Sequence, residues 1–526
     1  MIKDIQLRLK PEIAYTPLKL QLFVADALGG IDMNRIKDIK IVRRSIDARQ
    51  RQVMVNLSLQ VYIDELPPEN DALLHASYPD VTDSPSVIIV GAGPAGLFAA
   101  LKLIELGIKP IILERGKSVD ERRKDMAMIS RSNIVDPDSN YCFGEGGAGA
   151  FSDGKLYTRS KKRGSVENVL RTLFIHGAPH EVLVDAHPHI GTDRLPEVIK
   201  AIRNTIINHG GEVCFSSKVT DFILDGSNNV NGVITANGDR HFGPVILATG
   251  HSARDIYRLL QRHHIDMEPK GIAVGVRLEH PQQLIDRIIY HNPNGRGKFL
   301  PPAEYTMTTR CGGRGVYSFC MCPGGFIIPS ASGPDQQAVN GMSPGNRGTR
   351  WANSGIVVEI LPDDLKAYDE YGDLKVLKFQ EDIEKRFFEE SAGSQNAPAQ
   401  RMVDFVSGRQ SKDLPETSYA PGIHSSRIDK LLPDFVTSRL QNGFKEFGLK
   451  YKGFLTNDAC VIGAETRTSS PVRIIRDPHS LAHISFSGLF PCGEGAGYAG
   501  GIVSAAIDGE RCAMAAFDYL KSINQI

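Results

Sequence analysis

The chain lacks several features that would assign it to a broad class at once. No apolar run reaches the roughly 18 residues that a membrane-spanning helix needs, and the opening MIKDIQLRLKPEIAY has no signal-peptide pattern. Charge of one sign is not in excess, since 61 basic and 61 acidic residues give a formal net charge of +0. We therefore expect no membrane association, and the balance disfavours nucleic acid as a partner.

Cysteine and tryptophan are scarce, with eight and one residues among 526. The cysteines are scattered, which favours a reducing cytoplasm over a secreted disulfide scaffold. We find no fixed-period repeat and no low-complexity tract. The length exceeds one ordinary core, so two or three domains are expected.

Glycine, by contrast, is abundant and clustered. The chain has 51 glycines, and two of the stretches that contain them are nearly identical: GEGGAG at 144–149 and GEGAG at 493–497. Their flanking sequences differ, which argues against a duplicated domain. Glycine lets a backbone approach a ligand without a Cβ in the way. The sequence therefore predicts that Gly146–Gly149 and Gly493–Gly497 face one ligand.

The order of strand and helix patterns predicts an α/β fold with a Rossmann-like domain interrupted by an antiparallel-sheet insertion. Residues 1–65 read as β-α-β-β, a small α+β module of partial ferredoxin-like type, and the polar, proline-rich 66–85 as a linker. The Rossmann-like domain is expected at 86–270 and 466–526, and the insertion, a substrate or cap domain, at 271–465.

A dinucleotide-binding motif begins the second domain. The apolar strand Val87–Val90 runs into Gly91, Gly93 and Gly96, then a helix, then a strand ending at Glu114. In this arrangement the first glycine allows a tight turn, the second lets the backbone approach a pyrophosphate, and the third packs helix on strand. The helix N-terminus favours phosphate, and Glu114 is placed to accept hydrogen bonds from ribose hydroxyls.

Three further segments carry a resemblance. VILATGHSARD (245–255) is a strand entering Thr249-Gly250, GGEVCFSSKVTDFILD supplies a strand through Val219, and GLFPCGEGAGYAGGIVSAA is a strand, a glycine loop and a helix start. Together with the motif they resemble the FAD domain of glutathione-reductase type. The resemblance implies extended FAD, Glu114 on the adenosine ribose and Val219 near the adenine. Gly493-Glu494 stands where that family usually has Gly-Asp.

The whole chain resembles the bacterial family of uncharacterised FAD-dependent dehydrogenases. The likeness is carried by VRRSIDAR (42–49), FGEGGAGAFSDGKL (143–156), GHSARD (250–255), SFCMCPGGFIIPS (318–330) and GEGAGYAGGI (493–502). It implies a fold and FAD as the cofactor but no substrate. The FAD-binding residues expected from the motifs and the resemblance are Gly91, Gly93, Pro94, Ala95, Gly96, Glu114, Arg115, Gly146, Gly147, Ala148, Gly149, Ser152, Asp153, Val219, Thr249, Gly250, Gly493, Glu494, Gly500, Gly501 and Ile502.

Four residues are candidates for catalysis. Cys320 and Cys322 form a C-x-C pair that is a redox couple, a metal site or two buried apolar residues; no zinc spacing is present, and no metal is expected. Tyr498 either stacks on the flavin or packs at a helix start. Lys155 near the flavin pyrimidine would favour the reduced, anionic form.

Other polar residues have two interpretations each. His187 and His189 are expected to be structural, and His251 to lie near the cofactor. Arg347 and Arg350, beside Trp351, either bind a carboxylate or aromatic substrate or brace a loop. A basic cluster in the first module, of Lys37, Lys40, Arg43, Arg44, Arg49 and Arg51, is a solvated hairpin or a surface for RNA.

The favoured hypothesis is an FAD-dependent oxidoreductase that transfers a hydride between flavin N5 and an unidentified small molecule. No second GxGxxG lies between a strand and a helix, so NAD(P)H, if it is the electron donor, docks at the flavin. Two alternatives stay open: a flavoprotein that acts on RNA or a protein recruited by residues 1–65, and a flavin-bound sensor without turnover.

Overall fold

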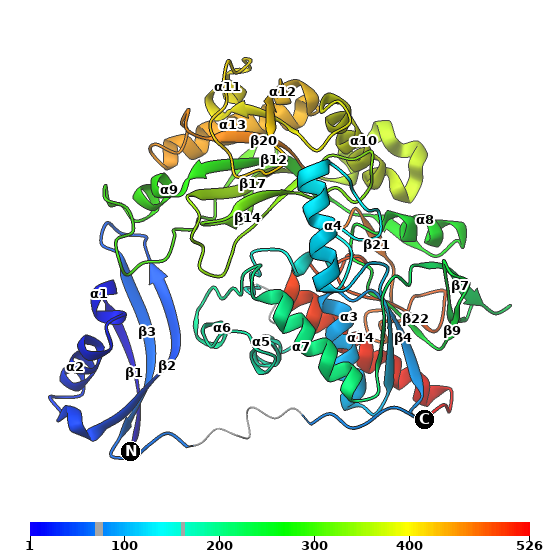
Figure 1. Cartoon of the computed structure of the whole chain (residues 1–526), viewed down its shortest axis with the longest axis horizontal. Coiled ribbons are helices and arrows are strands. Elements are labelled where there is room, and N and C mark those ends of the chain that lie inside the picture. The colour runs from blue at the N-terminus through cyan, green and yellow to red at the C-terminus, as the bar shows by residue number, and fades with distance from the viewer. Residues whose placement is uncertain (69–76, 159–163) are drawn as a thin grey trace.

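The computed structural model describes residues 1–68, 77–158 and 164–526, arranged as a small module and two larger bodies (Figure 1). The expected linker therefore falls partly, at 69–76, outside the described residues. The N-terminal module lies at one side, the insertion forms one end of the molecule, and the segments before and after the insertion meet in the third body.

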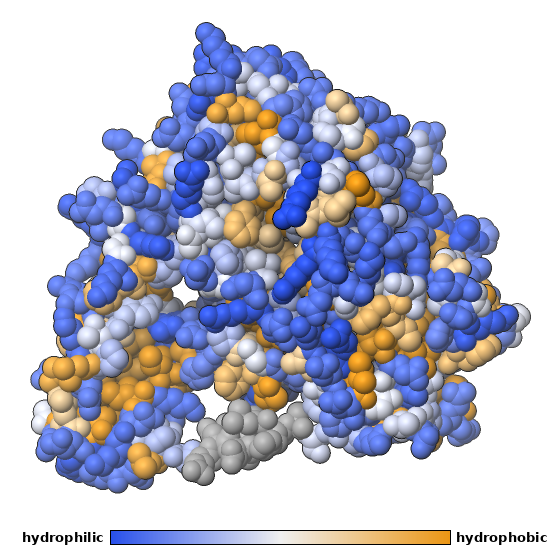
Figure 2. Space-filling model, in the orientation of Figure 1, coloured by the Kyte–Doolittle hydropathy of each residue, from blue (hydrophilic) through white to orange (hydrophobic). Residues whose placement is uncertain are grey.

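The N-terminal module is a three-stranded antiparallel sheet with two helices on one face. It comprises β1 (Ile2–Leu9), α1 (Pro11–Ala14), α2 (Pro17–Ala27), η1 (Met33–Arg35), β2 (Ile36–Asp47) and β3 (Met54–Ile63), in sheet order β1-β3-β2. Alternate residues of β3, among them Leu57 and Leu59, are buried under the helices. This is the first half of a ferredoxin-like fold. Figure 2 shows apolar residues gathered on this module, where Leu18, Leu22 and Phe23 of α2 are exposed.

The Rossmann-like domain has a five-stranded parallel sheet. Its order is β22 (Leu489–Pro491), β10 (Val245–Leu247), β4 (Ser86–Val90), β5 (Lys109–Leu113) and β6 (Glu212–Cys214). One edge strand, β22, comes from the last segment of the chain, so the sheet is completed only after the chain has returned from the insertion.

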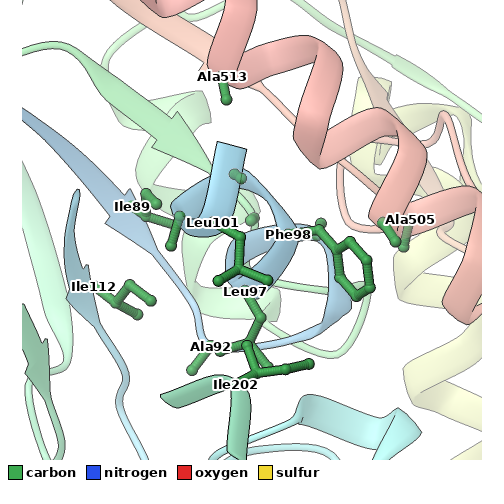
Figure 3. Packing of buried hydrophobic residues seen from close by; sticks show 14 of the residues in the cluster. Ile89, Ala92, Leu97, Phe98, Leu101, Ile112, Ile202, Ala505 and Ala513 are labelled. Carbon is green, nitrogen blue, oxygen red and sulfur yellow. The ribbon is translucent and has the colours of Figure 1, made fainter. Parts of the chain in front are cut away.

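The core of this domain forms around α3 (Pro94–Glu105), which lies between the sheet, α7 (Leu195–Asn208) and the C-terminal α14 (Ile502–Ser522). In Figure 3, Phe98 points toward Ala505 of α14, and Leu97 lies near Ile202 of α7. Small residues on α14 let the two helices approach closely; a Cβ on Gly509 would lie 2.1 Å from the Ala95 carbonyl oxygen.

The remaining elements of this domain surround the sheet. They are α4 (Val119–Ser132), η3 (Gly147–Gly149), α5 (Val166–Ile175), α6 (Glu181–Val184), α8 (Arg254–Arg262), the meander β7 (Val219–Leu224), β8 (Val230–Thr235) and β9 (Arg240–Phe242), and the crossing pair β11 (Met267–Pro269) and β21 (Val472–Ile474). The pair β11 and β21 joins the two chain segments that connect this domain to the insertion.

The insertion is built on a seven-stranded sheet. Its order is β13 (Thr308–Cys311), β14 (Arg314–Cys322), β17 (Trp351–Ile360), β12 (Ile272–Pro281), β20 (Cys460–Glu465), β18 (Ala397–Arg401) and β19 (Ile423–Ser425). All neighbouring pairs are antiparallel except β18 and β19, so the predicted antiparallel sheet is correct in its main part. The central strands β12 and β17 have ten residues each.

Two long helices cover this sheet. α10 (Lys375–Glu390) and α13 (Asp434–Lys450) bury Phe387 and Phe444 in the core beneath them. The smaller elements are α9 (Gln282–Ile289), the hairpin β15 (Phe326–Pro329) and β16 (Val339–Met342), η4 (Pro362–Asp364), η5 (Lys366–Leu374), α11 (Met402–Ser407) and α12 (Ile428–Leu431).

Candidate functional site

A cavity of about 450 Å³ opens at the carboxyl ends of the parallel strands. Val90 and Leu113 end β4 and β5, Ala248 follows β10, and all three line it. The opposite wall comes from the insertion, through residues of β14 and the hairpin β15–β16. The crevice beyond the carboxyl ends of the strands is where open α/β sheets bind their ligands.

The three motif glycines have different surroundings. A Cβ on Gly91, whose φ is +107°, would lie 2.5 Å from the Ala248 carbonyl oxygen, and one on Gly96 would lie 2.0 Å from the Gly91 oxygen. A Cβ on Gly93 would meet nothing nearer than the Gly147 Cα at 4.0 Å. The first and third glycines thus serve the protein's own packing, whereas Gly93 leaves space that belongs to the cavity.

Two helix N-termini point their free amides to this space. Gly93 is the N-cap of α3 and Gly501 the N-cap of α14, and neither helix has a side chain that caps it. Both glycines line the cavity. Uncapped first-turn N–H groups and the positive end of the helix dipole form a site for anionic groups such as a pyrophosphate.

The first glycine string and part of the second reach the same cavity: among the described residues, Glu494 alone of 493–497 lines it, and contact of both strings with one ligand stays a prediction. Gly147, Ala148 and Gly149 line the cavity from one side, and Glu494, Gly500, Gly501 and Ile502 line it from the other. The loops come close enough that a Cβ on Gly149 would lie 3.3 Å from Ile502 Cγ1. A structure with distant loops would have refuted the one-ligand hypothesis.

Not every residue of the two strings faces the cavity. Gly146 packs against Ile199 and donates its amide to the Ala92 carbonyl at 2.8 Å, and Gly493 packs against Ala95 and donates its amide to Asp508 at 2.8 Å. Within the described residues neither lines the cavity, so direct contact of these two glycines with the ligand stays a prediction that this geometry does not support. Both have positive φ, of +79° and +73°, which explains why glycine stands there.

Glu114 lines the cavity, but its carboxylate is engaged by the protein. Its two oxygens accept hydrogen bonds from the amides of Ala92, Gly116 and Gly144 at 2.8–3.0 Å, and the residue is 5% exposed. The acid therefore ties the end of β5 to the turn after β4 and to the first glycine string. The ribose contact stays a prediction.

The other expected binding residues line the cavity, apart from Gly96, which allows close packing of α3 against the turn after β4. They are Pro94, Ala95, Arg115, Ser152, Asp153, Val219, Thr249 and Gly250, joined by His251, whose Nδ1 lies 3.4 Å from Glu494 Oε1. Arg115 covers the Phe143 ring at 4.4 Å and pairs with Asp255, so its charge is already balanced within the protein.

Sequence reasoning missed Arg467, a buried arginine on the cavity wall. Its guanidinium donates to Glu384 of α10 at 2.9 Å and to Ser332 and Gln336 at 2.7 Å each. It therefore fixes the return segment after β20 against the insertion. The only signal in the sequence was a charged residue shortly after the apolar stretch Val461–Ala464, in the string VIGAETRTSS.

The C-x-C pair lies at an irregularity of β14. Cys320 has a φ of +41°, and the register with β17 shifts between Phe319 and Cys322. Buried Arg277 holds this bend by donating to the Cys320 carbonyl at 2.7 Å and to Cys322 Sγ at 3.3 Å. Both thiols are free and line the cavity.

The surroundings of the pair disfavour a reactive thiolate. Cys320 exposes its surface to the cavity, yet enclosure by protein raises the pKa of its thiol to about 12, and burial also raises that of Cys322. A nucleophilic or metal-bound cysteine needs the thiolate form. The structural interpretation is therefore favoured, and the catalytic one stays a prediction.

A second space, which we call the outer chamber, adjoins the cavity. It measures about 850 Å³ and shares Lys155, Tyr157, Tyr305, Thr306, Phe319 and Gly500 with the cavity wall. Tyr498 lines the chamber rather than the cavity; its hydroxyl donates to the Ile474 carbonyl at 3.0 Å and its ring lies under Arg476 at 3.8 Å. Its flavin-stacking role is thereby disfavoured.

An acid at the chamber wall binds three cationic groups. Glu304 Oε1 lies 2.8 Å from His187 Nδ1, and Oε2 lies 4.0 Å from Lys155 Nζ and 3.9 Å from Arg347 Nη1. Burial alone would raise the pKa of Glu304, but the hydrogen bond from His187 and the two cations hold it down at about 2. The same hydrogen bond raises the pKa of His187.

An ion pair forms the wall between the two spaces. Asp153 lines the cavity, Arg347 lines the chamber, and Arg347 Nη2 donates to Asp153 Oδ2 at 2.7 Å. Both side chains are buried. Lys155, which donates to the Met321 carbonyl, lies on both spaces. Arg347 thus braces a wall, whereas Arg350 pairs with exposed Glu416 and covers Trp351 away from the chamber.

The basic cluster of the first module is partly neutralised. Arg44 pairs with Asp185 at 2.7 Å and so joins the module to the rest of the chain, and Arg49 pairs with Asp47 at 2.8 Å. These contacts weaken the case for an RNA surface, and recruitment of RNA or a protein stays a prediction.

Three side chains with metal-ligand atoms lie together at α14, and an arginine guanidinium already occupies the space between them. Cys492, Asp508 and Cys512 bring their ligand atoms within 4.8 Å of one another among the described residues. The Arg476 guanidinium donates to Asp508 Oδ1 at 2.6 Å and to Cys512 Sγ at 3.4 Å. A positive charge at that place disfavours a metal ion.

The cavity fits an extended dinucleotide. The open space beside Gly93 admits a pyrophosphate, two uncapped helix ends supply donors for it, and glycine loops from both halves of the domain leave room for a flat group. Residues 84–235 match the family described as "FAD binding domain" and residues 271–468 the one described as "FAD-dependent protein, C-terminal domain-like". Residues 1–62 match a domain of unknown function. The fold and site thus define a flavoprotein of the oxidoreductase class with FAD as its cofactor.

The particular family follows from a full-length relative. The chain is 40% identical over 498 residues to an uncharacterised protein of Clostridium beijerinckii, covering 91% of this chain and 92% of that one. The protein belongs to this uncharacterised FAD-dependent family.

Solved structures of similar architecture are more distant. They include a geranylgeranyl bacteriochlorophyll reductase-like protein of Thermoplasma acidophilum, with 14% identity, 84% of each chain covered and a TM-score of 0.33. A 3-ketosteroid-Δ4-(5α)-dehydrogenase of Rhodococcus jostii has 14% identity over 84% of this chain and 99% of that one, with a TM-score of 0.36. Neither carries information about the reaction here. Among the described residues, no helix combines the length and apolarity required to cross a bilayer.

Proposed function

We propose that the protein is a cytoplasmic FAD-dependent oxidoreductase that transfers a hydride between flavin N5 and a small molecule bound in the outer chamber. The observation that carries the proposal is the shared wall of Lys155, Tyr305 and Phe319, which puts a second, larger space directly beside the cofactor cavity. The eight free cysteines favour the cytoplasm.

Bound FAD would supply the hydride acceptor or donor. The cavity residues Gly93, Gly147 and Gly501 would hold it through their backbones. The uncapped amides of α14 would stabilise negative charge on the reduced ring, as oriented dipoles do in a site that excludes water.

His187 is suited to exchange a proton with the substrate. Its Nδ1 is held by Glu304, and Nε2 has no hydrogen-bond partner among the described residues. The side chain is 62% exposed on the chamber wall. A carboxylate that orients an imidazole and stabilises its charged form is the usual arrangement of a general acid–base histidine. Oxidation of a substrate by hydride loss commonly releases a proton as well, and His187 would accept it.

The proposal is tested by anaerobic reduction of the purified yellow protein. NADH, NADPH and panels of candidate metabolites are added separately, and bleaching of the visible flavin band is followed. We expect at least one compound to reduce the flavin, and a His187→Asn variant to keep its FAD while reacting more slowly and with an altered pH profile. A flavin that light reduces but no compound reduces would contradict the proposal and favour the sensor.

A further inference from the structure

One charged side chain on the outer chamber lacks a counter-ion. The chamber is lined by the acids Glu304 and Asp508 and by the cations Lys155, Lys270 and Arg347, with His187 beside them. Glu304 is engaged by three cationic groups, and Asp508 by Arg476 at 2.6 Å. Within the described residues, no carboxylate lies within 4.0 Å of Lys270 Nζ, and no hydrogen bond from it is present.

Lys270 has a fixed place in the fold. It lies between β11 and β12, where the chain passes from the Rossmann-like domain into the insertion, and its amide donates to the Pro471 carbonyl at 2.9 Å on the returning segment. It is half-buried. The segment that enters the insertion and the segment that returns from it are thus hydrogen-bonded to each other at Lys270, the residue that presents the free ammonium group.

The neighbouring charges do not neutralise this lysine. Arg473 lies close to it and pairs with Glu268 at 2.8 Å, while Glu494, the acid that acts on Lys270 from the cavity side, lies 3.4 Å from His251. Burial and the Arg473 charge lower the pKa of Lys270. An ammonium group with that environment is costly until an anion binds.

We propose that the outer chamber takes a substrate with a carboxylate group and that Lys270 binds that group. This rests on the proposed function, because the chamber is the substrate space there. A single lysine suits a singly charged carboxylate. A phosphate dianion is usually held by arginine forks or several amides, and the chamber's arginine, Arg347, is already paired with Asp153.

The position of Lys270 also separates recognition from chemistry. Lys270 comes from the domain junction, whereas His187 and Glu304 come from two other segments of the chamber wall. A carboxylate on Lys270 would hold one end of the substrate, and the proton-exchanging imidazole would contact another part of it. The same chamber thus contains a binding residue and an acid–base residue with different partners.

Equilibrium binding to the FAD-loaded protein tests this assignment. Propionate, phenylacetate and benzoate are compared with propionamide, phenylacetamide and benzamide, which have nearly the same shape and no charge. Binding is followed by calorimetry and by perturbation of the flavin absorption band. We expect at least one acid to bind about ten- to a hundred-fold more tightly than its amide, as a charge-assisted contact provides.

Substitutions assign the preference to one residue. Lys270→Gln should abolish it, Lys270→Arg should keep most of it, and Lys445→Gln, which removes an exposed lysine of α13 outside the chamber, should leave it unchanged. FAD content is measured first in each variant. Equal binding of acids and amides, no binding of any acid, or an unchanged preference in Lys270→Gln would each overturn the assignment.

The two proposals fail in distinguishable ways. If no compound reduces the flavin but acids still bind in a Lys270-dependent manner, the oxidoreductase proposal fails and the anion site stands. If the flavin is reduced by uncharged compounds and binding has no charge preference, the oxidoreductase proposal stands and the anion site fails.

Discussion

The cofactor cavity and the outer chamber lie side by side, but different kinds of residues line them. The cavity wall contains glycine loops and the first turns of α3 and α14, which present backbone groups to a ligand. The chamber is lined by charged side chains, including Lys155, Glu304 and Arg347. A backbone wall suits a constant ligand, and a side-chain wall suits the ligand that distinguishes one flavoprotein from another.

The two walls also respond differently to mutation. A side chain added at a glycine of the cavity wall would occupy the space of the ligand, because no Cβ stands there in the native protein. A lost side chain on the chamber wall instead leaves a buried partner without its charge. The variants below separate these two cases.

The largest effect is expected at Gly93. A Gly93→Val side chain would enter the cavity, since protein atoms lie no nearer than 4.0 Å to the added Cβ, and its φ of −76° suits any residue. We expect a folded protein that loses most of its FAD, measured by absorbance and by circular dichroism.

Two comparisons make this prediction specific. Gly226→Val, at an exposed loop glycine with no atom within 4 Å, should keep the flavin. Gly96→Ala should damage the fold itself, because its Cβ would lie 2.0 Å from the Gly91 oxygen. Full flavin content in Gly93→Val would refute the interpretation of the motif as a phosphate cradle.

The next effect is expected at the wall that both spaces share. Arg347→Met keeps an unbranched apolar stem but removes the guanidinium, which leaves Asp153 buried without its counter-ion. Breaking one side of such a pair costs about 3–5 kcal/mol of unfolding free energy. Denaturant unfolding followed by the fluorescence of Trp351, the only tryptophan, measures the loss.

A second variant distinguishes charge from packing. If the cost comes from unpaired Asp153, the double variant Asp153→Asn with Arg347→Met should recover part of the lost stability. Additive losses in the double variant would contradict the charge argument and leave packing of the Arg347 side chain as the cause.

The sequence predicted the cavity far better than the chamber, for a physical reason. The cavity depends on local rules: a strand, a tight turn and a helix start follow one another within Val87–Gly96, and the same holds around Gly501. Only the convergence of the two glycine strings needed an inference beyond local order.

The chamber depends on contacts between distant segments. His187 and Glu304 are 117 positions apart, and Lys270 acquires its role only because the domain junction passes the chamber. No spacing rule relates such residues, so His187 was expected to be structural. The bend at Cys320 was equally hidden, because Arg277 on another strand holds it. Gly146 and Gly493 lie outside the cavity lining among the described residues, which shows that a glycine string does not reveal which of its members face a cavity.

A smaller effect is expected in the titration of His187. The hydrogen bond that Glu304 accepts from His187 raises the pKa of His187, so Glu304→Gln should lower that pKa, and the nearby cations Lys155 and Arg347 should lower it further. NMR spectra of protein labelled at the histidine Cε1 position measure the change, and the missing signal in His187→Asn identifies the resonance. An unchanged pKa would remove Glu304 as its partner.

The same pair affects stability at both ends of the pH range. The raised pKa of His187 in the folded state gives stability that is complete below about 6.5 and lost as pH rises through the raised value. The lowered pKa of Glu304 gives stability that is present above about 4.5 and lost as pH falls toward about 2. Glu304→Gln should remove both contributions, so its stability should depend less on pH than that of the wild type.

The smallest effect is expected at Cys320, which tests whether the cavity wall contains any reactive side chain. With its thiol pKa raised to about 12, Cys320 should remain protonated and react slowly with iodoacetamide at pH 8. Since its exposed surface lines the cavity, bound FAD should slow the reaction further. Cys320→Ser should keep its FAD and its reoxidation rate. Rapid alkylation at pH 8, measured by mass spectrometry of the Cys320 peptide, would indicate a thiolate beside the flavin and restore the redox hypothesis for this pair.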